Sequence, residues 1–132
     1  MRNKNRGRRS LSEKRQILSE SLVLKFIQEI VADGTMKSEY QEAMMDFLSY
    51  GTNDSMVFIE DMDKRSGLGV TLNGTVDISL LRNQVVFAVD DGQNLIKVTP
   101  NEIVEAGFSL GNESQPFFTT ENNIRIKFEN FS

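Results

Sequence analysis

The sequence predicts an α+β fold, in which an N-terminal antiparallel helical hairpin packs on a mostly antiparallel sheet of about five or six strands with a short inserted helix. Apolar residues recur at helical spacing up to about residue 50, and later apolar runs are short and separated by turn residues. The length of 132 residues and the 39% hydrophobic content suit one core. We expect residues 1–9 to form a flexible basic arm and residues 10–132 a single α+β domain.

The first helix is expected from Ser10 to about Ala32. Ser10 and Glu13 fit a capping box, and Gly34 follows as a stop signal. Residues 22–31 are apolar except for one narrow polar stripe, which predicts a mostly buried half. Residues 10–21 hold few large apolar side chains, so this half either projects beyond the body with the basic arm or packs lightly as a first turn.

A second helix is expected from about Ser38 to Ser49, ended by Gly51. Its apolar residues recur at the spacing of one helix face: Tyr40, Ala43, Met44, Phe47 and Leu48. The connection between the two helices is short. A short connection favours antiparallel neighbours and therefore predicts the hairpin.

The remaining chain predicts strands. Asn73-Gly74 is a strong hairpin signal between two of them, and Asp91-Gly92 is a second turn. Thr99-Pro100 and Glu102 resemble a helix start, so a short helix is expected from residue 100 to Ala106, with Gly107 as its stop. The expected strands are 56–59, 69–72, 75–80, 85–89 (a central strand), 95–98, 117–120 and 124–128.

Charge is divided unevenly along the chain. The formal net charge is −4, yet residues 1–15 carry seven basic side chains and one acid. The other 117 residues carry eight basic and eighteen acidic side chains. The basic residues of the first fifteen are Arg2, Lys4, Arg6, Arg8, Arg9, Lys14 and Arg15. This arm can contact phosphates, whereas the acidic body should favour basic protein surfaces. The alternative is a solubilising tail on an ordinary acidic domain.

The composition excludes several kinds of chemistry. The chain contains no Cys and no His, which removes disulfides, thiol nucleophiles and every catalytic arrangement that uses His. Glu60, Asp61 and Asp63 form the densest acidic patch, and the last two could share a face as oxygen ligands. An EF-hand fails because Arg65 and Ser66 occupy positions that need other residues. We therefore expect no enzyme, no cofactor and no bound metal.

The sequence favours a cytoplasmic binding protein, because it has no secretory signal and no apolar run long enough for a membrane span. We expect an inhibitor or regulator that docks on a nucleic-acid-handling protein or nucleoprotein complex. Its candidate contacts are the basic residues of the arm and, as a second surface, Glu60, Asp61 and Asp63. Small acidic domains without catalytic motifs are common among phage-encoded inhibitors, including anti-CRISPR proteins, and this chain is similar to them in style rather than in any motif.

Two alternatives stay open at this point. The chain could be a nucleic-acid-binding accessory protein that contacts phosphates through residues 2–15. It could also be a structural protein that oligomerises through exposed strand edges and the projecting helix. The arm has no aromatic residue for stacking on bases, and the expected second helix is acidic, which disfavours a helix-turn-helix. The sequence fixes neither the partner nor the oligomeric state.

Overall fold

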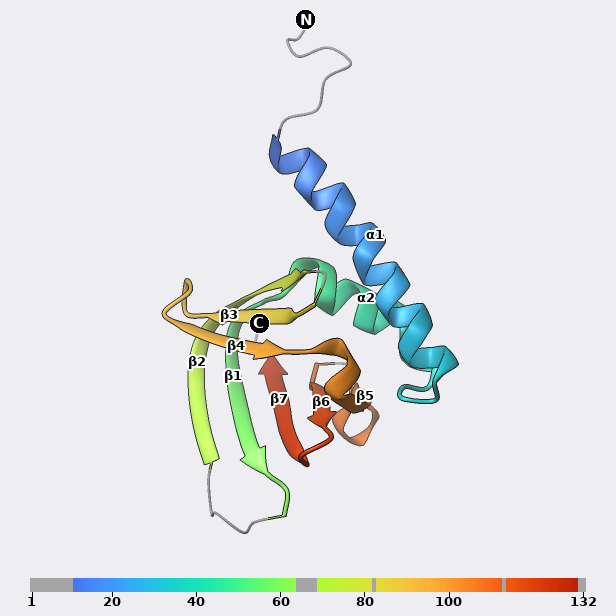
Figure 1. Ribbon diagram of the computed structural model, residues 1–132. Helices are drawn as coiled ribbons and strands as arrows, with labels where there is room; N and C mark the ends of the chain where they lie inside the picture. Colours follow the sequence, from blue (N-terminus) through green and yellow to red (C-terminus); the bar gives the residue numbers. More distant parts are fainter. Residues whose placement is uncertain (1–10, 64–68, 82, 113, 131–132) are drawn as a thin grey trace, which may run out of the picture.

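The structure, a computed structural model, describes residues 11–63, 69–81, 83–112 and 114–130, and only the backbone for 11–20. Within this part, two α-helices come first and seven strands follow (Figure 1). The helices are α1 (Leu11–Ala32) and α2 (Gln41–Tyr50). The strands are β1 (Thr52–Asp61), β2 (Gly69–Leu80), β3 (Val85–Val89), β4 (Asn94–Val98), β5 (Ile103–Phe108), β6 (Pro116–Thr120) and β7 (Ile124–Asn130).

The strands form one antiparallel sheet in the order β4-β3-β2-β1-β7-β6-β5. Phe87 on β3 and Phe118 on β6 are four strand positions apart, yet their ring centroids lie 5.6 Å apart. A flat sheet would separate these strands by about 19 Å, since neighbouring strands are about 4.8 Å apart. The sheet therefore curls into a half-barrel (Figure 1). The expectation of five or six strands was wrong.

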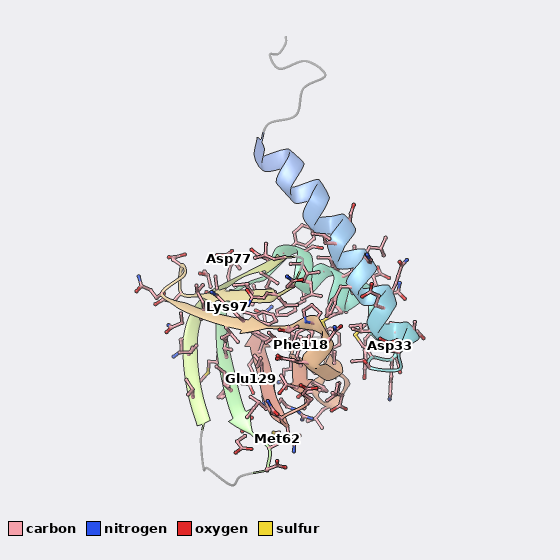
Figure 2. The ribbon with its side chains drawn as sticks, in the orientation of Figure 1. Asp33, Met62, Asp77, Lys97, Phe118 and Glu129 are labelled. Carbon is pink, nitrogen blue, oxygen red and sulfur yellow. The ribbon has the colours of Figure 1, made fainter. Side chains whose placement is uncertain are left out.

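The core lies between the curled sheet and the two helices. Phe87, Phe118 and Phe128 are fully buried, and the ring centroids of Phe87 and Phe128 are 5.0 Å apart. The helices add buried side chains to the same cluster: Val23, Phe26, Ile27, Ile30, Met44 and Leu48. In Figure 2, Phe118 is labelled among the side chains that lie between the sheet and the helices. Burial of this apolar surface on both sides holds the layers together.

The predicted hairpin at Asn73-Gly74 was wrong, because β2 is one strand of 12 residues that runs through this pair. Its first part pairs with β1 and its second part with β3, so the strand bends where its partner changes. Gly74 lies at the bend with φ 139°, and a β-carbon there would be 2.9 Å from the Cα of Asp90. Glycine is needed here for close approach of two backbones inside a sheet, rather than for a turn.

The two helices contact each other but do not form the predicted N-terminal hairpin. The amides of Thr35 and Met36 both donate to the carbonyl oxygen of Ile30, at 2.8 and 3.1 Å, and end α1. The carbonyl oxygen of Thr35 then accepts from the amide of Ala106 on β5, at 3.0 Å. A 3-10 turn at Ser38–Tyr40 follows and leads into α2. The connection is thus bonded to the edge of the sheet, and each helix packs on the sheet.

The predicted helix at residues 100–106 was also wrong. Pro100–Glu102 forms a single 3-10 turn, in which the Glu102 amide donates to the carbonyl oxygen of Thr99 at 2.9 Å. Ile103 is already extended and begins β5, which pairs with β6. Ile103 and Val104 are β-branched and favour a strand, and β6 is available as its partner. These two factors outweigh the helix-capping signal of Thr99 and Glu102. Gly107 is therefore a strand residue opposite Phe117, not a helix stop.

Other predictions are confirmed. The strand at 85–89 has the expected bounds and lies between β2 and β4, inside the sheet. The Asp91-Gly92 turn joins β3 to β4, with φ of 54° and 85° at its two central residues. The Gln93 amide closes it on the carbonyl oxygen of Asp90 at 3.1 Å. Positive φ at both central positions is typical of a type I′ hairpin turn.

Helix α1 extends beyond the sheet. Its 22 residues span about 33 Å, and its first half stands clear of the strands in Figure 1. This confirms the projecting half rather than a packed first turn. The second half is less buried than expected, because Leu22 and Leu24 are 41% and 42% exposed. The predicted capping box and the arm at residues 1–9 lie outside the described side chains.

Candidate functional site

The seven basic candidates divide between the N-terminal residues and the first half of α1. Arg2, Lys4, Arg6, Arg8 and Arg9 lie outside the described residues. Lys14 and Arg15 lie in the first half of α1, where the backbone alone is described. The structure therefore places two of the seven basic residues on a helix that extends away from the sheet (Figure 1).

The acidic candidates Asp61 and Asp63 lie at the end of β1, beside the turn that joins β6 to β7. Asp61 Oδ1 accepts a hydrogen bond from the backbone amide of Asp63 at 3.0 Å. Asp63 Oδ1 accepts from the side-chain amide of Asn123 at 2.7 Å, and the Asn123 carbonyl oxygen accepts from the Met62 amide at 2.9 Å. Met62 marks this end of the sheet in Figure 2. These contacts stabilise two adjacent turns, which is a structural role for both carboxylates.

Glu60 does not join this arrangement. It is exposed, and in the register of β1 with β7 it lies opposite Arg125. The three acidic candidates are therefore adjacent in sequence, but Glu60 lies in a different environment from Asp61 and Asp63. Within the described ranges, no three carboxylates are arranged to hold a metal ion.

A cationic cluster on the outer face of the sheet was missed by the sequence interpretation. The guanidinium carbon of Arg125 lies 4.4 Å from the ring centroid of Phe117. Arg125 also donates from Nε to Thr119 Oγ1 at 3.1 Å and pairs with Glu105 at 3.2 Å. Lys127 Nζ pairs with Glu129 at 3.5 Å. The alternation of apolar and basic residues from Ile124 to Phe128 indicated that one face of this strand meets solvent. The charges of Arg125 and Lys127 are paired with carboxylates of the same sheet.

An acidic groove lies between α1 and α2. It encloses about 450 Å³, and its apolar surface comes from Leu24 on α1 and Met45 on α2. Its carboxylates are Glu39, Glu42 and Asp46, and among the described side chains no basic one lines it. No hydrogen bond or ion pair of these three carboxylates is present in the described part of the chain. The sequence did not predict this groove, because the helical spacing of Leu24 and Met45 indicates buried core residues.

Two further depressions are larger. One of about 1010 Å³ lies between α1 and the loops around residues 81–84 and 99–101, and carboxamides of Asn83, Gln84 and Asn101 line it. The other, of about 600 Å³, lies beside the edge strand β5. Its rim includes Leu110, whose side chain is fully exposed and whose φ is 55°. Each depression is lined by described residues of both charges: Lys25 and Glu29 in the first, and Lys37 and Glu105 in the second.

No family model, curated protein or solved structure matches this chain. Of the helices in the described residues, none is both long enough and apolar enough to cross a membrane. Function must therefore be inferred from the charges and contacts of the chain itself.

Proposed function

We propose that this chain is a non-enzymatic, cytoplasmic binding protein that docks on a basic, nucleic-acid-handling protein complex and inhibits or regulates it. The observation that supports this proposal is the negative charge of the acidic body, which is the chain after residue 15. Residues 16–132 contain eighteen Asp and Glu but eight Lys and Arg. Two of these eight, Arg125 and Lys127, are paired with carboxylates on the sheet. The exposed field of the body is therefore strongly negative.

This charge favours one class of partner. A negative surface is repelled by nucleic-acid phosphates and attracted to the positive channels and grooves that bind them. A body that occupies such a surface competes directly with the nucleic acid. Inhibition by occupancy needs no catalytic residue, which agrees with a composition that lacks Cys and His. This is the style of phage anti-defence inhibitors, including anti-CRISPR proteins.

Affinity capture with the immobilised full chain tests the proposal. Lysate treated with nuclease is passed over the chain and, in parallel, over an unrelated acidic protein of equal size and net charge. We expect nucleic-acid-handling proteins to be enriched on the chain alone, and added duplex DNA to displace them. Recovery of the same proteins on both columns, or of no basic partner, would reject the proposal.

A second candidate function is nucleic-acid binding through the arm, which the projection of α1 away from the acidic sheet favours (Figure 1). Its test is a titration of the full chain, and of a chain without residues 1–9, against duplex and single-stranded DNA at two salt concentrations. Salt-sensitive binding that disappears with the arm would support this function. Equal binding by both chains, or none by either, would exclude it, since counterion release ties phosphate contacts to salt dependence.

A further inference from the structure

We propose that the acidic groove between α1 and α2 binds a basic peptide segment of the partner protein, with an apolar side chain of that segment inserted against Leu24 and Met45. This inference rests on the proposed function, because it names the part of the acidic body that meets the basic partner.

The apolar surface of the groove is available for contact. Leu24 is 42% exposed although its neighbours Val23, Phe26 and Ile27 on α1 are buried in the core. Met45 on the facing helix is half-buried and packs at the margin of the core. A flexible thioether adapts to side chains of different shape. A cavity of about 450 Å³ is large enough for one or two apolar side chains of a peptide.

The charges around this apolar surface are unfavourable for the isolated chain. Glu42 and Asp46 are four residues apart on α2 and therefore repel each other on one helix face. Glu42 lies in the first turn of α2, where the helix dipole favours an acid, but Asp46 lies in the middle of the helix without that compensation. Glu39 adds a third carboxylate in the preceding 3-10 turn. A bound cation would reduce the repulsion among these three carboxylates.

These features together specify the ligand. Lys and Arg can lay their aliphatic stems along Leu24 and Met45 while their charged ends reach the carboxylates. A polyanion such as nucleic acid is repelled by the same rim. A small cation would leave the apolar surface uncovered. A basic peptide segment with an apolar anchor satisfies both the charge and the surface.

Fluorescence anisotropy with designed peptides tests the site on the full chain. The probe is a labelled 14-residue helical peptide of Lys and Arg with two Leu residues four positions apart. A second peptide replaces both Leu by Ser. The chain is examined as wild type, as Glu42→Gln with Asp46→Asn, and as Leu24→Ser. The matched control is Asp77→Asn with Glu121→Gln, which changes the net charge equally at two exposed positions outside the groove.

We expect the groove double variant to weaken binding of the Leu-containing peptide about fivefold or more, and the control double variant less than twofold. Leu24→Ser should weaken that peptide and leave the Ser-containing peptide unchanged. Circular dichroism confirms that every variant retains its fold.

Equal weakening by the groove and control variants would overturn the groove assignment while leaving the general attraction of the acidic body to basic partners intact. Failure of the affinity capture would instead overturn the proposed function. A third outcome is that deletion of residues 1–9 strengthens peptide binding. The groove would then be occupied by the chain's own basic arm, and the assignment to a partner would be wrong.

Discussion

Replacement of Gly74 by Ala tests whether the bend in β2 holds the sheet in its curled form. Gly74 has φ 139°, a conformation that side chains rarely adopt, and the added β-carbon would meet the backbone of Asp90 at 2.9 Å. The backbone strain contributes about 1–3 kcal/mol. The forced contact contributes about 1–3 kcal/mol more, because backbone atoms cannot move aside as a flexible side chain does. We expect Gly74→Ala to lower the free energy of unfolding by about 2–6 kcal/mol.

Gly34→Ala is the matched control. Gly34 also has a positive φ, of 77°, but no atom lies within 4 Å of the position of its β-carbon. This variant should lose only the left-handed backbone penalty, about 1–2 kcal/mol. Urea unfolding followed by circular dichroism measures both values. The contact with Asp90 can be isolated by a double-mutant cycle with Asp90→Gly, which removes one of the crowding atoms and should recover part of the loss.

Equal losses for the two glycine variants would refute this reasoning. Such a result would mean that Asn73-Gly74 behaves as a hairpin turn, as the sequence predicted, and that Asp90 does not approach β2 at the bend.

Three other variants test separate contacts. Phe87→Ala should cost about 3–5 kcal/mol, because the fully buried ring closes the curl against Phe118 and Phe128; a thermal-unfolding loss below 1 kcal/mol would contradict that closure. Arg125→Lys should cost about 1 kcal/mol in urea unfolding, since Lys cannot keep the Nε bond to Thr119 while stacking; wild-type stability would show that a positive charge alone suffices. Leu110→Gly should raise the unfolding free energy by about 0.5–1 kcal/mol, because the side chain is fully exposed at φ 55°, and destabilisation would reveal an unseen contact of Leu110.

Local signals predicted those elements whose neighbours agree with them. The Asp91-Gly92 turn and the alternating strand that became β7 were confirmed, and their contacts agree with their local preferences: Asp91 accepts a hydrogen bond from Thr75, and β7 pairs with β1 and β6. The sequence predictions were wrong where a contact with a residue distant in sequence outweighed the preference of a local motif. Asn73-Gly74 has the composition of a turn, but Asp90 approaches it across the sheet. Residues 103–106 follow a helix-capping pattern, but β6 offers them a strand partner.

The helical hairpin failed for a related reason. A short connection between two amphipathic helices predicts that they pack mainly on each other. In the structure the connection bonds to Ala106 on β5, so the sheet determines where both helices lie. Because β5 itself was predicted to be a helix, no sequence argument could have supplied this contact.

The fold also changes which acidic residues need a functional explanation. Asp61 and Asp63 were chosen because they are dense in sequence, yet their carboxylates accept hydrogen bonds that hold two turns together. Glu42 and Asp46 belong to the expected second helix, whose acidity served only as evidence against a helix-turn-helix. They repel each other on one face of α2, and no described basic side chain lies beside them in the groove. Acids that stabilise a turn are accounted for by the fold. Acids that repel each other beside an exposed Leu24 agree with the basic partner that we propose.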